Sequence, residues 1–495
     1  LGMPSLRMAL RGADVITVAG LPEGSSPETR VRLRSIGDRD GSVDPFPPVE
    51  FDMRDIDPGR DLRSREAFID FASGVCSRRE QETGSGLAGD WEVLPRGQLT
   101  YLCSRFRGRI GGFDGVLWSN VPSAGGMSSS SAVVVSTAWA AMAVNGLTPW
   151  EEMSPGDLAD GIGISEWLRG TRGGCADHGG MIMGKVGELV AVGALPTSDE
   201  GRVPLPQEYA AVSFDTGVRR RYDEAAKDET VISYPLAVFA LRELILPALA
   251  RRDGFSGLAS GECLRLLRDV TPGNLGLSPA HIFELLRALP RRTSLREMER
   301  LAANAGRLEQ FSEFRHGEVA DRYPHLSADY PVLLRRRAAF ALAEQDRVHM
   351  MRSFLDRGDM ANALRLIRLS HSGDRDQEVD GELLARHAAA VAAGEENWRL
   401  CFLPGGYGRM TPEYDRVVGA VNRCLVEAGG EEAGAVQRLG AGWGGRAGGL
   451  VRRDCAEGEP AQLAAAVRQR TGIEMDLQSS VVVPGEGASL LQPPS

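Results

Sequence analysis

Residues 122–132 constrain the fold of this chain more than any other segment. They read PSAGGMSSSSA, so two glycines precede four consecutive serines, and the segment opens onto an apolar run that begins at Val133. Glycine lets a backbone approach an anion closely, and the unpaired amides of a first helical turn add donors and about half a positive charge from the helix dipole. The segment therefore predicts a loop that binds phosphate and continues as a buried helix over residues 128–145.

A flexible Gly/Ser linker is the alternative interpretation of this composition, but a linker is expected to continue into polar, low-complexity sequence. Here an apolar helix follows instead. Residues 113–121, which come before the loop, include Val116, Leu117 and Val121 and predict a strand that ends at a proline-marked turn. Strand, glycine loop and helix in this order are what a nucleotide site requires. The serine hydroxyls can hold a phosphate oxygen or a Mg²⁺ ion.

The overall composition narrows the class of protein. The chain has 495 residues, which allows about two to four domains and a core large enough for an enzyme. Its net charge is −10, which argues against a protein that coats nucleic acid or an anionic membrane. Arginines cluster at residues 219–221 and 335–337, and such runs usually form solvated faces.

Cysteine usage and hydropathy predict a cytoplasmic protein. The seven cysteines lie far apart with no C-x-x-C pair, as expected of free thiols in a reducing cytosol. The longest apolar run, residues 132–144, is too short to span a bilayer, and no targeting segment is visible.

The order of predicted elements indicates an α+β protein. Strand patterns occur at residues 189–192, 209–214, 436–439 and 449–451, and helical patterns occur at 98–106, at 149–168 and repeatedly after residue 231. The result is a glycine-loop half followed by a helix-rich half. Because the chain begins at Leu1 and runs at once into apolar residues, we expect a strand pair in mid-domain and further sequence upstream.

Two more glycine-rich segments could carry chemistry. Residues 173–178, GGCADH, place Asp177 among small residues, either as a turn former or as a general base for phosphoryl transfer. Residues 440–445, GAGWGG, predict a glycine-packed hairpin between apolar strands. Residues 179–185 match G-x-x-x-x-G-K by coincidence, because Val186 follows where that motif needs a hydroxyl.

Three of these segments, residues 122–132, 173–178 and 440–445, together resemble the galactokinase branch of the GHMP small-molecule kinases. Residues 122–132 are similar to the family's P-x-G-x-G-L-S-S-S-A motif, residues 174–178 to G-I-M-D-Q, and residues 440–445 to G-A-G-F-G-G. The resemblance implies a two-domain GHMP kinase fold. An N-terminal ATP-binding domain, incomplete at its start, would span residues 1–205. A helix-rich C-terminal domain would span residues 206–495, with an insertion at residues 374–410.

The resemblance also implies an activity and a set of site residues. The activity is that of an ATP-dependent sugar 1-kinase, which moves the γ-phosphate of ATP to the anomeric hydroxyl of a hexose or related sugar. Asp177 would be the base, or the anion that orients the sugar hydroxyl. The cofactors would be ATP and Mg²⁺, with Ser129 and Glu166 as metal ligands. ATP would contact Gly125, Gly126, Met127, Ser128, Ser129, Ser130 and Ser131, and the substrate would contact Asp177, Tyr234, Gly442 and Gly444. The implied partner is a small-molecule sugar, with neither nucleic acid nor membrane, and the oligomeric state stays open.

The chain departs from the family pattern in several places. The first motif, G-R-V-N-L-I-G-E-H-T-D-Y, which supplies an arginine for the transferring phosphoryl group, is not found, and an incomplete N-terminus is the simplest account. His178 stands where the family has glutamine, and Glu166 lies one residue closer to Asp177 than usual. Two alternatives therefore stay open: a catalytically inactive sugar- and ATP-binding regulatory protein, or a kinase for another sugar such as galacturonate or arabinose.

Overall fold

The computed structural model divides the chain into two compact units. The N-terminal unit comprises Pro4–Leu205 and Val482–Ser495, and the C-terminal unit comprises Leu1–Met3 and Pro206–Val481. The chain thus passes between units at Leu205, and its last residues return to the first unit. The structure describes every residue except 1–2, 22–28, 37–45, 57–58, 65, 69, 73, 76–90, 122–126, 170–172, 220–222, 252–260, 320–322, 324, 376, 441, 458–459, 476–480 and 492–495.

The described residues of the N-terminal unit form three small sheets. One has the strand order β3-β6-β4-β5, with β4 and β6 parallel and the other pairs antiparallel. A second has the order β1-β7-β8, and β2 pairs with β13. The strands are β1 (Ser5–Arg7), β2 (Ala9–Leu10), β3 (Val15–Gly20), β4 (Arg30–Ile36), β5 (Val49–Asp52), β6 (Asp114–Ser119), β7 (Glu188–Gly193), β8 (Ser198–Pro204) and β13 (Pro484–Gly485).

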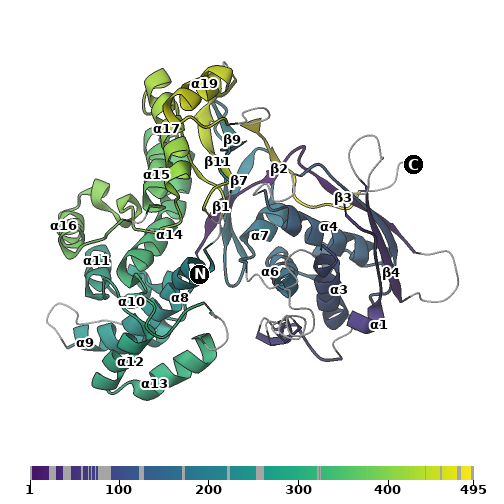
Figure 1. Cartoon of the computed structure of the whole chain (residues 1–495), viewed down its shortest axis with the longest axis horizontal. Helices are drawn as coiled ribbons and strands as arrows, with labels where there is room; N and C mark the ends of the chain where they lie inside the picture. Colours follow the sequence, from purple (N-terminus) through teal and green to yellow (C-terminus); the bar gives the residue numbers. More distant parts are fainter. Residues whose placement is uncertain are drawn as a thin grey trace. The chain divides into compact units, whose positions relative to one another are not determined.

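Helices fill the space between two of these sheets. α4 packs against β3, whereas α7 packs against β1 and β7, so the helical layer lies between the two sheets (Figure 1). The core of this layer is apolar and contains Val134, Ala138, Trp139 and Met142 of α4. The helices are α1 (Met53–Ile56), α3 (Val93–Arg105), α4 (Ser129–Val144), α5 (Pro149–Glu152), α6 (Pro155–Ser165), the 3-10 turn η2 (Glu166–Arg169) and α7 (Ala176–Met183).

The strand-loop-helix order predicted around residue 125 is confirmed on both sides of the loop, by β6 and α4. The predicted single helix over 149–168 is wrong, because it breaks after α5. Ser154 caps a new helix by accepting a hydrogen bond from the Asp157 amide at 3.1 Å, and Pro155 occupies the first helical position.

A four-stranded sheet and many helices build the C-terminal unit. The sheet order is β10-β11-β9-β12, with strands β9 (Tyr209–Asp215), β10 (Gly434–Arg438), β11 (Arg446–Arg452) and β12 (Val481–Val482). The longer helices are α8 (Glu224–Phe239), α11 (Pro279–Ala288), α12 (Leu295–Asn304), α13 (Leu308–Phe314), α14 (Leu334–Asp356), α15 (Met360–Gly373), α16 (Gly381–Ala392), α17 (Pro412–Gly429) and α19 (Pro460–Thr471). The short ones are α9 (Leu246–Leu249), α10 (Pro272–Leu275), α18 (Arg453–Glu457), the π-helical turns η3 (Ala240–Ile245) and η6 (Arg315–Val319), and the 3-10 turns η4 (Gly261–Cys263), η5 (Leu267–Asp269), η7 (Glu396–Trp398) and η8 (Leu400–Phe402).

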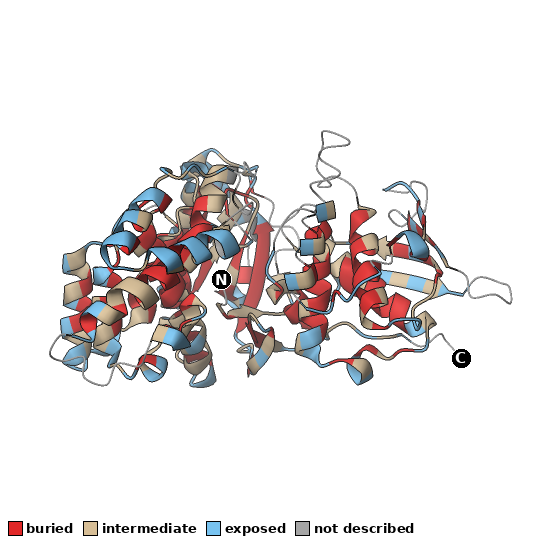
Figure 2. Cartoon of the chain, turned by 90° about the horizontal axis from the view of Figure 1, so that it is seen from below, coloured by how far each residue is buried: buried red, intermediate tan, exposed pale blue. Residues whose placement is uncertain are grey.

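Helix packing in this unit corrects one prediction made from charge. Arg336 and Arg337 of α14 are buried rather than solvated, because Arg337 pairs with the buried Glu229 of α8 at 2.9 Å. Figure 2 shows buried residues gathered in the interior of each unit.

One helical stretch among the described residues, Ala225–Leu249, is long and apolar enough to cross a membrane. Of its most apolar 18-residue window, 56% is buried inside the protein, and its residues Ile232, Leu236 and Phe239 belong to the core of the C-terminal unit. The stretch is therefore accounted for as a core helix.

Candidate active site

The start of α4 has the conformation expected of an anion site. Ser128 is the N-cap residue, and its carbonyl accepts the first helical hydrogen bond from Ala132 at 3.0 Å. Its backbone lies in the left-handed region with φ of 56°, which is uncommon for a residue other than glycine. Its side chain makes no capping hydrogen bond, so the Ser128 hydroxyl does not compete with another acceptor for the first-turn amides. Gly125 and Gly126 lie outside the described residues.

The Ser128 side chain reaches Asp177 instead. Its hydroxyl donates to Oδ2 of Asp177 at 2.6 Å. Asp177 does not sit in a glycine turn, as one interpretation of residues 173–178 had it, but in the first turn of α7, where the helix dipole favours a carboxylate. The structure thus brings together a serine of the first predicted motif and the aspartate of the second.

The Glu166 side chain lies beside another serine of the same run, at the start of α4. The Ser131 hydroxyl donates to its Oε2 at 3.1 Å, and Nε2 of the buried His178 is 3.1 Å from that oxygen. Glu166 lies one residue closer to Asp177 than in the family pattern, yet its side chain still meets the serines of α4. It does so because Glu166 begins the 3-10 turn η2 rather than continuing α6. Ser129, the other predicted metal ligand, is the first residue of α4.

Arg7 is a site residue that sequence reasoning missed. Its Nη1 lies 2.8 Å from Oδ1 of Asp177, and its Nε donates to Ser5 at 3.0 Å. β1 carries Arg7 there by pairing with β7 (Arg7 opposite Val190) while it packs on α7. The nearest sequence signal is Gly180 of α7, where a Cβ would lie 2.8 Å from the Cβ of Arg7. A glycine shows that some segment approaches closely, but it does not say which one.

The two carboxylates are stabilised in their ionised form. Burial raises the pKa of Asp177, but the Arg7 charge, the Ser128 hydrogen bond and the nearby His178 outweigh it, so the net pKa is lower than usual. Burial likewise raises the pKa of Glu166, and His178, Ser130 and Ser131 reverse that shift. Both groups therefore carry negative charge at neutral pH.

The residues present fit a magnesium ion that is held mainly by a nucleotide. No group of three or more His, Cys, Asp or Glu side chains placed to hold a metal occurs in the part of the chain that the structure describes. Mg²⁺ in nucleotide sites commonly takes one or two protein ligands and completes its shell with phosphates and water. Glu166 offers a carboxylate of this kind beside the serines of α4, and the pairing of Ser129 with Glu166 as metal ligands stays a prediction.

The third motif and Tyr234 lie in the C-terminal unit. The motif connects the paired strands β10 and β11, as predicted. A Cβ on Gly442 would lie 2.5 Å from the Arg409 carbonyl oxygen, and one on Gly444 would lie 2.6 Å from that of Val218. Both glycines therefore make room for the chain's own backbone. Tyr234 is 4% exposed in the core, where burial raises its pKa. A role for these three residues beside a substrate stays a prediction.

Known proteins resemble the elements that carry the site. A family described as GHMP kinases N terminal domain covers the stretch from α3 to the end of α7, including Glu166 and Asp177. Residues 95–185 match the GHMP kinase N-terminal domain. This match confirms the GHMP kinase resemblance for residues 95–185, which contain the first two of the three motifs.

One solved structure extends the likeness in fold to nearly the whole chain. The galactokinase of Lactococcus lactis, solved in complex with galactose, aligns with a TM-score of 0.56 at 16% identity, over 99% of this chain and 90% of that chain. A mevalonate kinase aligns with a TM-score of 0.36 at 10% identity, over 98% of this chain and 94% of that chain. No curated protein matches the chain by sequence. The chain therefore has a galactokinase-like α+β fold, as predicted.

Proposed function

We propose that this chain is an ATP- and Mg²⁺-dependent sugar 1-kinase. The observation that supports this most is the 2.6 Å hydrogen bond between Ser128, at the uncapped start of α4, and Asp177. This contact connects the start of α4, which suits phosphate groups, with a carboxylate that can accept the proton of a substrate hydroxyl. Phosphoryl transfer asks a protein mainly to position two reactants and to neutralise charge, and these groups can do both.

In this reaction the start of α4 and the Asp177 carboxylate have different roles. Amides of the first turn of α4 bind the phosphates of ATP, and Ser130 adds a hydroxyl. The anomeric oxygen of the sugar forms a bond to the γ-phosphorus while the bond from that phosphorus to the β,γ-bridging oxygen breaks, and ADP leaves. The hydroxyl proton passes to the Asp177 carboxylate and then to water. When bound, Mg²⁺ held by Ser129 and Glu166 would neutralise phosphate charge.

Arg7 and Ser128 hold the two oxygens of Asp177 in this scheme. Their contacts, 2.8 Å and 2.6 Å, fix the direction of the carboxylate while its remaining lone pairs stay available to a hydroxyl. Both side chains of the Arg7–Asp177 pair are partly exposed, 40% and 36%, so a substrate can reach them.

Turnover of ATP with a panel of sugars tests the proposal. Galactose, other hexoses, galacturonate and arabinose are offered with Mg²⁺, and the phosphorylated position is found by ³¹P NMR. We expect a sugar 1-phosphate with at least one sugar, and a loss of about 10²- to 10⁴-fold in kcat in Asp177→Asn. Binding of nucleotide without turnover of any sugar would instead support the regulatory protein, and phosphorylation at another hydroxyl would contradict 1-kinase activity.

A further inference from the structure

The third motif, residues 440–445, has a strained backbone at its one large side chain. Trp443 lies in the left-handed region with φ of 61°, between Gly442 and Gly444, whose φ values are also positive. This conformation costs free energy in a residue that has a side chain, so other contacts must hold it in place. Strain of this kind is commonly found where a loop has to keep one conformation for a ligand.

Arg409 supplies contacts that hold this conformation. Its carbonyl accepts a hydrogen bond from the Trp443 amide at 2.8 Å, and its guanidinium carbon lies 4.5 Å from the centre of the Trp443 ring. Gly442 packs closely on the same residue, because a Cβ there would lie 2.7 Å from the Cβ of Arg409. Tryptophan is the ring that binds a cation best, and this chain has it where the family pattern has phenylalanine. Arg409 thus contacts both the backbone and the ring of the strained residue.

The same guanidinium also reaches α8. Its Nη2 donates to the hydroxyl of Thr230, which lies about one helical turn before Tyr234. Tyr234 and the glycines of the third motif are the residues of the C-terminal unit that are predicted to contact the substrate. Arg409 therefore connects the helix that carries one of them with the loop that carries the others.

Stability alone gives a poor account of Arg409. The residue is 1% exposed, and its Nη1 has no hydrogen-bond partner among the residues that the structure describes. Burial lowers the pKa of its guanidinium, so this environment disfavours the charge. Glu229, whose charge favours the cation, is already paired with Arg337. A buried charge without a counter-charge of its own destabilises the fold, which favours a role of Arg409 in the site.

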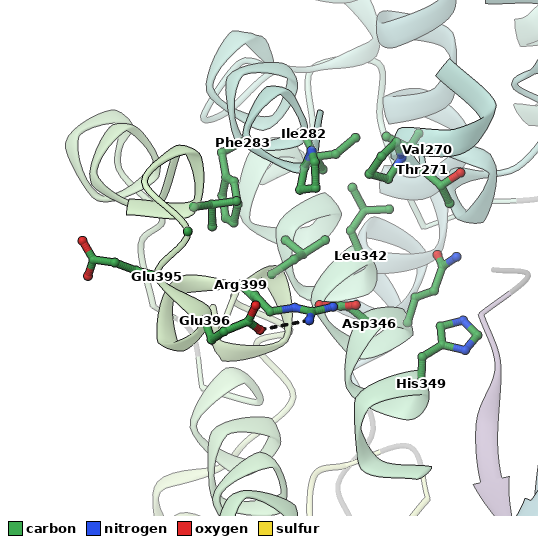
Figure 3. A pocket seen from close by; sticks show the side chains of 16 residues that line it. Val270, Thr271, Ile282, Phe283, Leu342, Asp346, His349, Glu395, Glu396 and Arg399 are labelled. Atoms are coloured by element: carbon green, nitrogen blue, oxygen red, sulfur yellow. Dashed lines mark hydrogen bonds and ion pairs between the residues drawn. The ribbon is translucent and has the colours of Figure 1, made fainter. Parts of the chain in front are cut away.

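The segment that carries Arg409 is anchored at both ends. It belongs to residues 374–410, which the family resemblance marks as an insertion. Figure 3 shows Arg399 of this insertion beside Asp346 of α14, in a cavity that the insertion lines together with α11 and α14. The Arg409 amide donates to the Asp374 carbonyl at 3.0 Å, which joins the two ends of the insertion. The insertion therefore holds Arg409 on a fixed base.

We propose that Arg409 is a positioning residue that fixes the third motif and Tyr234 in one arrangement for the sugar. This inference rests on the proposed sugar kinase activity and deepens it, because it gives residues 374–410 a role in sugar binding. In the proposed scheme the start of α4 binds the phosphates of ATP. The effect of Arg409 should therefore fall on the sugar and not on the nucleotide.

Arg409→Met tests the role in the reaction, because methionine keeps an unbranched side chain and removes the charge. With the sugar of the panel that is turned over, we expect the KM of the sugar to rise about tenfold or more and the KM of ATP to change less than about twofold. Arg409→Lys keeps a cation near the ring and should recover part of the loss. Arg416→Met, the same change at an exposed arginine of α17, is the control and should behave as the parent does. An unchanged sugar KM in Arg409→Met would overturn the inference.

A second measurement follows the loop itself and needs no turnover. The chain is labelled with 5-fluorotryptophan, and Trp443→Phe assigns the ¹⁹F NMR resonance of Trp443. We expect this resonance to shift and broaden in Arg409→Met and in Thr230→Val, while the urea midpoint of Arg409→Met does not fall. Thr230→Val leaves Arg409 in place and removes the hydroxyl that its guanidinium binds.

The two measurements separate failure of this inference from failure of the proposed function. A Trp443 resonance that is unchanged in both variants would overturn the inference even if the sugar KM rises. If Arg409→Met does not fold, the resonance and the sugar KM of Thr230→Val decide instead. If the parent chain phosphorylates no sugar, the proposed function fails, and the resonance alone then decides whether Arg409 fixes the loop.

Discussion

Asp177 shows how neighbours set the chemistry of one carboxylate. It meets Arg7 from β1, Ser128 from the start of α4, and His178 from its own helix. Burial alone would favour the protonated acid, and these three groups favour the anion. A proton acceptor in phosphoryl transfer must be ionised before the acceptor hydroxyl arrives. We therefore expect the activity of this chain to persist into mildly acidic conditions.

Replacement of Arg7 tests this balance. Arg7→Gln removes the charge that lowers the pKa of Asp177, so that pKa rises and the acid limb of the kcat/KM profile moves to higher pH. Activity depends on the ionised carboxylate, so it is present above the pKa and lost as the pH falls through it. We expect a loss of about tenfold or more at acidic pH and a smaller loss above pH 8.

Two controls accompany the Arg7 profile. Arg11→Gln changes an exposed arginine of the same unit and should leave the profile unchanged. Arg7→Lys keeps the charge and should restore much of the acid limb. An acid limb that does not move in Arg7→Gln would show that the ion pair is a surface contact of small energetic effect.

The site residues were only partly predictable from sequence. Ser128 and Asp177 could be proposed from local glycine-rich motifs, whereas Glu166 could be proposed only from the family resemblance. Arg7 could not, since its contact with Asp177 exists only after β1 has paired with β7 and packed on α7. Gly180 and Gly184 are traces of that packing in the sequence.

At the scale of elements, glycines set how closely strands approach α7. A Cβ on Gly180 would lie 2.8 Å from that of Arg7, and one on Gly184 would lie 2.6 Å from that of Ala9. Residues 179–185, which match the phosphate-loop pattern by coincidence, thus form a packing surface. Its glycines allow β1 and β2 to run close to the helix and bring Arg7 to the site.

Gly180→Ala tests this packing. Overpacking at such a contact costs about 1–3 kcal/mol, so we expect a lower midpoint in urea unfolding and a lower kcat as Arg7 is displaced. Gly273→Ala is the matched change in α10, where a Cβ would meet nothing within 4 Å, and it should leave both quantities unaffected. Unchanged stability and kcat in Gly180→Ala would contradict the packing account.

At the scale of the whole molecule, local patterns predicted elements well and long-range pairing poorly. The α4 helix and strands β6, β9 and β10 follow from apolar runs with turn signals at their ends. The return of Val482–Ser495 to the N-terminal unit and the burial of Arg337 depend on contacts between distant segments. Periodicity within a segment contains no information about such contacts.

The buried Glu229–Arg337 pair is expected to support the C-terminal unit. Glu229 accepts from the Arg337 guanidinium at 2.9 Å and from the Leu333 amide at 2.8 Å. Glu229→Gln leaves a buried guanidinium without its counter-charge, which costs about 3–5 kcal/mol in thermal or urea unfolding. Asp329→Asn breaks the exposed pair with Arg296 and should have no measurable effect. Equal stability of the two variants would show that Arg337 finds another partner.

A crystal structure with Mg²⁺ and a non-hydrolysable ATP analogue tests the central claim most directly. We predict that phosphate oxygens will lie within hydrogen-bond distance of the amides of Ser129 and Ser130, with the terminal phosphate next to Asp177. A nucleotide bound away from the start of α4, or phosphates out of reach of Asp177, would contradict the account.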